Sequence, residues 1–268
     1  MKYCAINGNK QTHLAVTDRG LAYGDGIFTT AKIIEGQVIL LDKHLMRLID
    51  GCNRLKINAP EKGALAEQMR VAAKGFLLGC LKVVITSGSG GRGYSRSGLT
   101  QDSTQVIVMV NEFPIHYQKQ CRTGITLGNS EQQISSSPML AGIKHLNRLE
   151  QVLLRAELDM SADDDLVVTN EKGHVIETTC ANLFYWRNNQ LYTPNLISSG
   201  VDGIIRQTIL RFAPSVNVVE TSIDDLHHAE EIFICNSLMG IMPVKTYNNR
   251  QLQIKNALKL QVQLCDVI

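Results

Sequence analysis

Residues 140–150 read Leu-Ala-Gly-Ile-Lys-His-Leu-Asn-Arg-Leu-Glu, and this stretch predicts a junction between extended chain and a helix. Apolar residues then recur at helical spacing, so we expect a helix over residues 146–158 that buries one face. The residues of that face are Leu146, Leu149, Leu153 and Ala156. The serine-rich run before the stretch ends at Pro138, which favours an extended chain that turns before Gly142. Lys144 lies at the junction.

Lys144 is a candidate nucleophile because a lysine at such a junction would be held rigidly and partly desolvated. Burial disfavours the ammonium form, and a neutral amine can attack a carbonyl and form a Schiff base. The alternative is a solvated surface lysine, which is the usual place for this residue type.

The composition is that of a globular protein with more than one average domain. The chain has 268 residues, of which 44% are hydrophobic and 19% charged, and these values disfavour a disordered or membrane protein. A net charge of +2 without a long Lys/Arg cluster indicates no nucleic-acid partner. Strands and helices alternate, so we expect an α/β fold of two domains or one large unit.

The cysteines indicate neither a metal site nor a disulfide framework. There are seven, which is an odd number, and none is spaced as C-x-x-C. Residues 1–10 lack a signal-peptide pattern, and no apolar stretch approaches membrane-spanning length. We therefore expect a cytoplasmic protein without a membrane partner or a metal.

Two features of the N-terminal half suggest a site. A bent, glycine-rich segment leads into a strand where Thr29 and Thr30 place adjacent hydroxyls on opposite faces. Asp42 is the expected cap of the next helix, and Arg47 lies off its apolar stripe. Arg47 is therefore available either for solvent or for binding an anion with its fixed fork of donors.

A glycine-rich loop follows a strand at residues 87–95 (SGSGGRGYS). The spacing G-x-x-x-x-G-K-[ST] of a phosphate-binding loop is absent and no helix pattern follows, which disfavours nucleotide binding. We expect a mobile active-site loop that presents Arg92 and Tyr94. The polar stretch that follows the next strand predicts domains at residues 1–114 and 124–268, joined by a linker at residues 115–123.

The C-terminal half contains a candidate buried carboxylate and two candidate anion sites. Strands on either side would bury Glu177 and Asn182, and a buried carboxylate requires a partner; the alternative is a surface glutamate beside a structural asparagine. A helix over residues 204–212 would offer the unpaired N–H groups of its first turn to an anion. Residues 236–240 (NSLMG) follow an apolar strand and form the second candidate.

These parts together match the requirements of pyridoxal phosphate. Its aldehyde needs a lysine, its phosphate needs hydrogen-bond donors, and its ring nitrogen needs an acid partner that keeps it protonated. Four stretches also resemble the fold-type IV pyridoxal-phosphate enzymes, which include branched-chain and D-amino-acid aminotransferases and aminodeoxychorismate lyases. They are residues 24–31 (GDGIFTTA), 88–95 (GSGGRGYS), 141–152 (AGIKHLNRLEQV) and 235–244 (CNSLMGIMPV). The likeness is greatest to the lyases of that group and covers nearly the whole chain.

The resemblance implies an α/β (α+β) architecture of two domains with the cofactor between them, and a homodimer whose partner subunit contributes to each pocket. It implies that Lys144 is the Schiff-base lysine and that Glu177 partners the pyridine nitrogen. The groups implied to hold the phosphate are Arg47, the N–H groups of Ile204 and Ile205, and the Ser237 hydroxyl. Two positions depart from relatives: Ile205 replaces a common threonine and Leu238 a hydroxyl, which puts Arg206 and Leu238 in doubt as direct ligands.

The implied function is a lyase of folate biosynthesis that converts 4-amino-4-deoxychorismate to 4-aminobenzoate and pyruvate. The substrate amine would displace Lys144, which would then take a proton from the amine-bearing ring carbon before pyruvate is eliminated. Thr30 is the candidate that protonates the departing enolpyruvate. The candidates for binding the substrate carboxylates are Arg92, Tyr94, Asn147 and Arg148.

Two alternatives stay open. One is a D-amino-acid or branched-chain aminotransferase on the same fold, which would need a pocket for an amino acid's carboxylate. The other is a nucleotide-binding regulatory module built on the glycine-rich loop.

Overall fold

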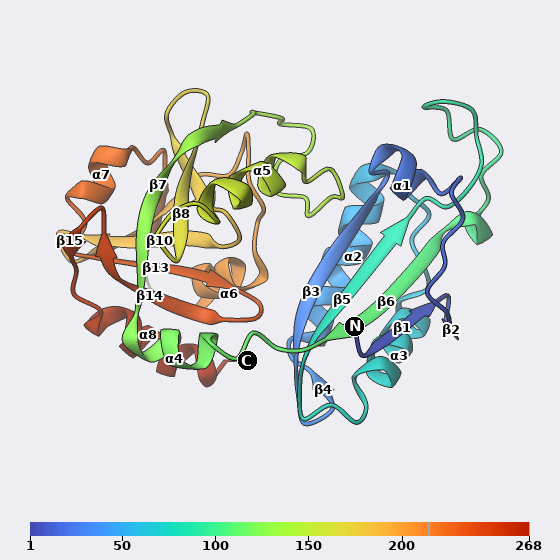
Figure 1. Ribbon diagram of the computed structural model, residues 1–268, viewed down its shortest axis with the longest axis horizontal. Coiled ribbons are helices and arrows are strands. Elements are labelled where there is room, and N and C mark those ends of the chain that lie inside the picture. Colours follow the sequence, from blue (N-terminus) through green and yellow to red (C-terminus); the bar gives the residue numbers. More distant parts are fainter. Residues whose placement is uncertain (214, 268) are drawn as a thin grey trace. The chain divides into compact units, whose positions relative to one another are not determined.

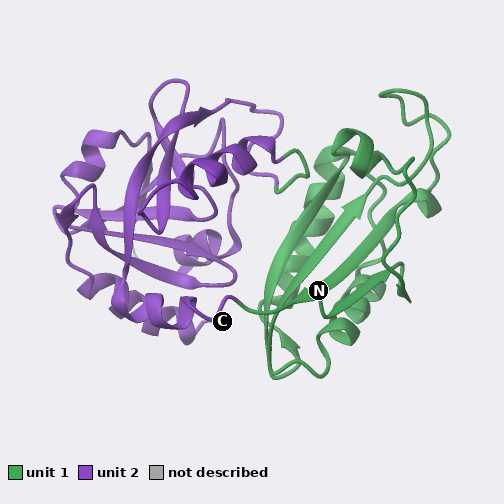
Figure 2. Cartoon of the chain, in the orientation of Figure 1, with its two compact units in different colours: residues 1–113, 144–147 green, residues 114–143, 148–268 purple. Residues whose placement is uncertain are grey.

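The computed structural model describes residues 1–213 and 215–267, and the chain divides into two compact units (Figure 2). Unit 1 comprises Met1–Phe113 and Lys144–Asn147, and unit 2 comprises Pro114–Ile143 and Arg148–Ile268. Unit 1 therefore also includes a short segment from the middle of the chain.

The division differs from the expected domains in two respects. Helix α4 (Tyr117–Thr123) occupies most of the expected linker and belongs to unit 2, so the prediction of a linker there is wrong. Lys144 was expected in the C-terminal domain, but Lys144–Asn147 groups with unit 1. The reason is backbone pairing with a strand of that unit, which is described below.

Unit 1 is an antiparallel sheet with two long helices. Its elements are β1 (Tyr3–Ile6), β2 (Asn9–Lys10), α1 (Arg19–Tyr23), β3 (Gly26–Ile34), β4 (Gln37–Val38), α2 (Leu41–Leu55), α3 (Lys62–Ala73), β5 (Leu78–Thr86), the 3₁₀ helix η1 (Gln101–Ser103) and β6 (Gln105–Asn111). The strand order is β2-β1-β6-β5-β3-β4. Asn7 and Gly8 both have positive φ angles, 51° and 80°, and form the tight turn between β1 and β2.

Helices α2 and α3 cover one face of this sheet (Figure 1). Along β3, Ile27 and Thr29 are buried on that face, whereas Phe28 and Thr30 alternate to the other face and are half-buried. The close packing of α2 needs Gly51, because a Cβ there would lie 3.0 Å from Cδ1 of Ile27. Each leucine that α2 buries completely contributes roughly 1.5–3 kcal/mol to the core.

Helix α2 begins differently from the sequence prediction. Its N-cap is Leu40, which has a left-handed backbone (φ 56°) and makes no side-chain capping bond. Asp42 lies inside the first turn, so the prediction that it is the cap is wrong. Its carboxylate there still interacts favourably with the positive end of the helix dipole.

The helix after Lys144 begins later and buries a different face than expected. Helix α5 spans Leu149–Leu158, and its buried residues are Leu154 and Leu158. Leu149 and Leu153 are 71% and 50% exposed, so the predicted apolar face is wrong. Residues 144–147 cannot join the helix because they are paired with β3.

Unit 2 is built on a mixed sheet. Its elements are α4, β7 (Ile125–Ile134), α5, β8 (Asp165–Asn170), β9 (Val175–Thr178), β10 (Asn182–Arg187), β11 (Gln190–Pro194), α6 (Ile204–Phe212), β12 (Val216–Val219), α7 (Ile223–His227), β13 (Glu231–Asn236), β14 (Gly240–Tyr247), β15 (Arg250–Gln251) and α8 (Lys255–Cys265). The order is β12-β11-β10-β13-β14-β7-β8-β9, and β15 pairs with β14. Helices α4 and α8 both pack beside β14 (Figure 1). Gln261 Nε2 on α8 donates to the carbonyl of Cys121 on α4 (2.8 Å).

The core of unit 2 is a cluster of aliphatic and aromatic side chains from these strands. Leu127, Leu183 and Val244 are completely buried in it, and Met239 also belongs to it. The turn that carries Ser237 therefore begins and ends on buried strands, which fixes its position within unit 2. In the part of the chain that the structure describes, no helix has the length and apolar character to cross a bilayer.

Candidate active site

Lys144 is anchored to unit 1 through its backbone and its side chain. The N–H of Phe28 donates to the carbonyl of Lys144 (2.9 Å), and the N–H of Leu146 donates to the carbonyl of Gly26 (3.0 Å). The Nζ atom of Lys144 lies 4.7 Å from the centroid of the Phe28 ring, and that of Lys82 lies 5.0 Å from it. An ammonium group over an aromatic face is stabilised by the ring's quadrupole. Lys144 is thus a half-buried lysine with a defined direction, on the sheet face that α2 and α3 leave uncovered.

Thr30 and Arg47 belong to unit 1 as well. Thr30 follows Phe28 on the same face of β3, because alternate residues of a strand share a face. Arg47 is half-buried on α2, one turn after His44. Burial and the charge of Arg47 lower the pKa of His44 to about 3, which keeps this histidine neutral.

Glu177 and Asn182 bind one loop of unit 2, just before α6. The Glu177 carboxylate is 7% exposed, and its Oε2 accepts from the N–H of Val201 (3.0 Å). The side-chain amide of Asn182 donates to the carbonyl of Val201 (2.8 Å) and accepts from the N–H of Gly203 (3.1 Å). The backbone of Val201 also pairs with Gly142, two residues before Lys144 in the chain.

Helix α6 begins at this loop with a small residue. Gly203 is its N-cap, and a Cβ there would lie 2.0 Å from Oδ1 of Asn182. The first-turn N–H groups of Ile204 and Ile205 have no acceptor within the helix and sit at its positive end. Arg206 points elsewhere: it donates to Asp202 (2.8 Å) and to the carbonyl of Pro194 (3.1 Å). Arg206 is therefore engaged within unit 2, and the backbone N–H groups are what the start of this helix offers to an anion.

The turn after β13 is organised by Asn236. Its Oδ1 accepts from the N–H groups of Leu238 (2.9 Å) and Met239 (3.0 Å), and its Nδ2 donates to the carbonyl of Cys180 (3.2 Å). Ser237 lies in this turn and is half-buried. Asn236 thus joins the Ser237 turn to the β9–β10 turn between Glu177 and Asn182.

Asp165 fixes that β9–β10 turn and was missed in the sequence. Its carboxylate accepts from the hydroxyls of Thr178 (2.7 Å) and Thr179 (2.6 Å) and from the N–H of Thr179 (3.1 Å). Burial raises the pKa of Asp165, while the two hydroxyls and backbone N–H groups oppose that rise. The usable signal was that Asp165 directly precedes an apolar run, so that the strand begins with it.

The expected substrate-binding residues occupy both units. In unit 1, Arg92 is exposed, Tyr94 is 91% exposed, and the Asn147 amide donates to the carbonyl of Gly24 (3.1 Å). In unit 2, Arg148 donates to the carbonyl of Ile143 (2.7 Å). Burial lowers the pKa of Arg148, and the nearby carboxylates of Glu177 and Glu150 oppose this, so Arg148 lies within the field of Glu177.

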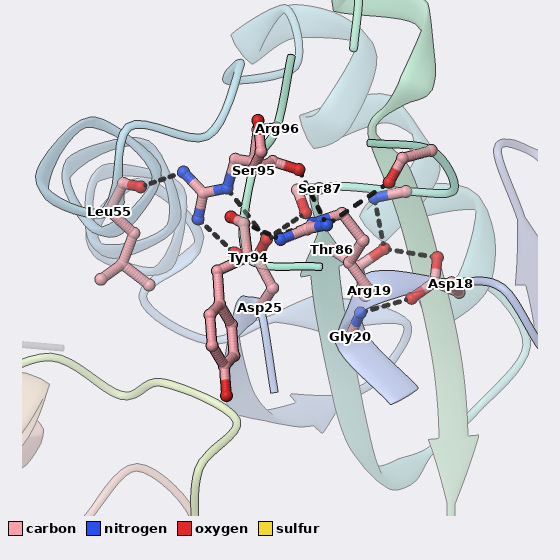
Figure 3. Close-up of polar contacts among 12 residues, drawn as sticks. Asp18, Arg19, Gly20, Asp25, Leu55, Thr86, Ser87, Tyr94, Ser95 and Arg96 are labelled. Carbon is pink, nitrogen blue, oxygen red and sulfur yellow. Dashed lines mark hydrogen bonds and ion pairs between the residues drawn. The ribbon is translucent and has the colours of Figure 1, made fainter. Parts of the chain in front are cut away.

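The glycine-rich loop is tied down in the structure, in place of the mobile loop that we expected. Arg19 and Arg96 share the Asp25 carboxylate, and Arg19 also donates to backbone carbonyls of the loop (Figure 3). The sequence signalled only that Asp25 lies between two glycines, and it showed no sign of the two arginine partners. Among the described residues, no group of three or more His, Cys, Asp or Glu is placed to hold a metal ion.

Comparison with known proteins assigns the family. The model of amino-transferase class IV matches residues 26–247. An aminodeoxychorismate lyase from Vibrio harveyi is 39% identical over 244 residues, which cover 89% of each chain. A putative branched-chain-amino-acid aminotransferase from Methanocaldococcus jannaschii is 28% identical, with 90% of this chain and 87% of that protein covered.

Solved structures give the same result. The 4-amino-4-deoxychorismate lyase of Pseudomonas aeruginosa superposes with a TM-score of 0.91 and 33% identity over 98% of each chain. The branched-chain aminotransferase of Escherichia coli superposes with a TM-score of 0.85 at 21% identity, over 99% of this chain and 93% of that one, and shows the shared fold. The two-sheet α/β architecture expected from the resemblance is confirmed. This chain therefore belongs to the amino-transferase class IV family.

Proposed function

We propose that this protein is a pyridoxal-phosphate-dependent lyase that converts 4-amino-4-deoxychorismate to 4-aminobenzoate and pyruvate. The observation that carries the proposal is the similarity to two lyases of that name, at 39% and 33% identity over most of the chain. Both values exceed those of the two aminotransferases reported above, at 28% and 21%. The product 4-aminobenzoate places the reaction in folate biosynthesis.

The chain has groups that fit the cofactor. When bound, pyridoxal phosphate supplies an aldehyde that bonds an amine and a ring that accepts an electron pair. Glu177 suits the ring nitrogen, because a buried carboxylate favours a protonated partner. The start of α6 suits the phosphate, because the first-turn N–H groups of a helix form an anion site, and Gly203 at the N-cap leaves room for the Asn182 side chain that supports this turn. The proposed phosphate-binding groups are the N–H groups of Ile204 and Ile205, the Ser237 hydroxyl and Arg47.

Two side chains of unit 1 would move protons. Lys144 would hold the cofactor through its aldehyde, and its amine, once the substrate amine takes that place, would accept the proton from the ring carbon that bears the substrate amine. Its Nζ beside the Phe28 ring gives the amine a fixed direction for this transfer. Cleavage of the enolpyruvyl ether follows, and the hydroxyl of Thr30 gives a proton to the methylene carbon of the departing enolpyruvate. The remaining ring becomes aromatic, which drives the step.

The substrate carries two carboxylates, and four side chains are proposed to bind them. The guanidinium groups of Arg92 and Arg148 can each hold a carboxylate with two parallel hydrogen bonds. Tyr94 and Asn147 can donate one each. Asn147 also supports Gly24, so its amide has a structural partner as well.

The second candidate function is aminotransfer, which the family name and the shared fold of the Escherichia coli aminotransferase favour. A transaminase would release a keto acid and take up another. Steady glutamate production from D-alanine or a branched-chain amino acid with 2-oxoglutarate would identify this activity.

The test is a turnover assay on the purified protein with added pyridoxal phosphate. We expect visible absorbance from the bound cofactor, and pyruvate release from 4-amino-4-deoxychorismate that a coupled lactate dehydrogenase reports. Lys144→Ala should lose both the absorbance and pyruvate release, whereas Lys172→Ala, an exposed lysine on a turn of unit 2, should keep both. A wild-type protein that binds the cofactor but releases no pyruvate would refute the lyase assignment.

We also infer that the protein acts as a homodimer in the cytoplasm. Leu149, Val152 and Leu153 expose a continuous apolar stripe on α5, which a second copy would cover. The seven cysteines are all free thiols, and Cys180 and Cys265 are exposed, which suits a reducing compartment. Sedimentation should give twice the chain mass, and Leu153→Asp should shift it toward the monomer.

A further inference from the structure

We propose that Arg19, Asp25 and Arg96 are positioning residues that shape the loop at residues 89–96 so that Arg92 binds a carboxylate of the substrate. The inference rests on the proposed function and adds a determinant of substrate affinity to it. It starts from a cluster of three charged side chains in unit 1 that connects this loop to the rest of the unit (Figure 3).

Arg19 holds the middle of the loop through backbone carbonyls. Its side chain is 5% exposed, and it donates to the carbonyls of Gly93 (2.9 Å), Tyr94 (3.1 Å) and Ser95 (3.2 Å). The carbonyl of Gly90 lies 3.4 Å from the same guanidinium. A single buried arginine therefore contacts the carbonyl groups of four loop residues, and each contact is charge-assisted.

Asp25 and Arg96 close the loop against the rest of unit 1. Asp25 accepts from Arg19 Nε (2.9 Å), Arg96 Nε (2.9 Å) and the Ser87 hydroxyl (2.6 Å), and it also pairs with a terminal nitrogen of Arg96. Arg96 donates to the carbonyls of Leu55 (2.6 Å) and Lys56 (3.0 Å) at the C-terminus of α2. That end of the helix favours a cation. The loop is thus fastened to the same helix that carries Arg47.

The base of the loop has its own support. Asp18 accepts from the Thr86 hydroxyl (2.8 Å), which in turn accepts from the N–H of Gly88 (3.2 Å). Gly91 turns the chain with a φ of 71°, and a Cβ there would lie 2.1 Å from the carbonyl of Ser95. The backbone of the loop is therefore held in one conformation. The large side chains that project from its tip are those of Arg92 and Tyr94.

The tip is suited to an anion. Arg19 and Arg96 share the carboxylate of Asp25, and Arg92 adds a further positive charge at an exposed position. No carboxylate pairs with Arg92 within residues 1–213 and 215–267, whereas Tyr94 packs edge-on against Tyr23 (5.6 Å between ring centroids). An arginine whose backbone is already held in place loses less conformational freedom when its guanidinium binds a carboxylate. The cluster should therefore raise the affinity for the dicarboxylate substrate.

The experiment separates loop geometry from catalysis. Asp25→Asn keeps the size of the side chain but removes the charge that both arginines share. We expect KM for 4-amino-4-deoxychorismate to rise about tenfold while kcat stays within about twofold, because the lost interaction serves binding. Trypsin should cut after Arg92 about tenfold faster, as the loop opens more often. Asp50→Asn, an exposed position on α2, is the matched control and should change neither value.

A double-mutant cycle with Arg92→Gln decides whether the cluster acts through Arg92. If it does, Asp25→Asn adds little to KM once Arg92→Gln is present. An equal rise of KM in both backgrounds, or trypsin cleavage of Asp25→Asn no faster than that of Asp50→Asn, would overturn the proposal. Gly91→Ala alters the loop directly, because its Cβ would lie 2.1 Å from the carbonyl oxygen of Ser95 and 3.3 Å from Nη1 of Arg19, and it should reproduce both effects if Asp25→Asn fails to fold. The cleavage readout needs no substrate, so a protein with a tightly held loop but no pyruvate release would count against the lyase assignment alone.

Discussion

The hydroxyl of Thr29 lies 2.6 Å from Nδ1 of His44, and neither side chain is exposed to solvent. This hydrogen bond joins β3 to α2 inside unit 1. The neighbour of Thr29 in the chain is Thr30, and Arg47 follows His44 by one helical turn. The bond therefore fastens together the two elements that carry a proposed catalytic hydroxyl and a proposed phosphate-binding arginine. His44 Nε2 is buried without a hydrogen-bond partner among the described residues, so Thr29 is the hydrogen-bond partner that holds the ring.

Thr29→Val should lower the free energy of unfolding by about 1–3 kcal/mol, because it leaves a buried imidazole nitrogen without a partner. Urea unfolding measures this change. Thr30→Val is the matched control, since Thr30 is half-buried on the opposite face, and it should alter stability by no more than about 0.5 kcal/mol. Equal losses in the two variants would show that the Thr29–His44 bond has no special role.

In turnover, Thr30→Val should be the more impaired of the two variants, which is the reverse of their order in stability. Thr30→Val removes the hydroxyl that we propose as proton donor, so pyruvate release should slow by about 10²-fold or more, the usual contribution of a general acid. Absorbance of the bound cofactor should be unchanged, because no cofactor contact is assigned to this hydroxyl. Unchanged pyruvate release in Thr30→Val would exclude Thr30 from the chemistry.

His44 should make the protein less stable in acid. Its folded pKa of about 3 lies below the ordinary value of 6.5, so between these values the unfolded chain binds a proton that the folded chain does not. Stability from this group is complete above pH 6.5 and is lost as pH falls toward 3. Between pH 6 and 4 the loss amounts to roughly 2–3 kcal/mol.

His44→Asn tests this dependence. Asparagine places an amide near the former Nδ1 and can keep the bond to Thr29, but it does not titrate. The difference in unfolding free energy between wild type and His44→Asn should therefore change by that amount over the interval. A constant difference would mean that His44 is already protonated in the folded protein or remains neutral after unfolding.

The sequence predicted the regular elements better than the polar contacts between them. The strand with Thr29 and the helix at residues 204–212 depend on local rules of turn chemistry and periodicity, and the structure contains both. Asp165 and the Arg19–Asp25–Arg96 cluster depend on partners up to 76 positions apart in the chain, as between Arg19 and Ser95. No local pattern specifies such pairs.

The helix after Lys144 shows how tertiary contacts override a periodic signal. Leu146 continues the heptad-like apolar spacing, yet its N–H bonds to Gly26 and it lies outside α5. The stripe of Leu149 and Leu153 was predicted to be core and is exposed. Apolar periodicity indicates that a helix has an apolar face, and it does not tell whether that face packs against its own chain or lies on the surface.

Gly203→Ala should weaken cofactor binding without unfolding unit 2. The backbone at Gly203 (φ −67°, ψ 144°) is open to any residue, so the only obstacle is the Cβ, which would lie 2.0 Å from Asn182 Oδ1. Asn182 would have to leave both Val201 and Gly203, and the first turn of α6 would lose its support. We expect the Kd for pyridoxal phosphate, measured by equilibrium dialysis, to rise about tenfold or more, the cost of a lost charge-assisted contact to the phosphate.

Asn182→Ala supplies the control for this prediction. It removes the side chain that the new Cβ would strike, so Gly203→Ala should add little to the Kd of Asn182→Ala. If the two substitutions multiply their effects instead, the clash is not the cause, and the methyl group itself must obstruct the phosphate at the start of α6. If neither substitution alters the Kd, the N–H groups of Ile204 and Ile205 do not bind the phosphate, and Arg47 and Ser237 would have to hold it without them.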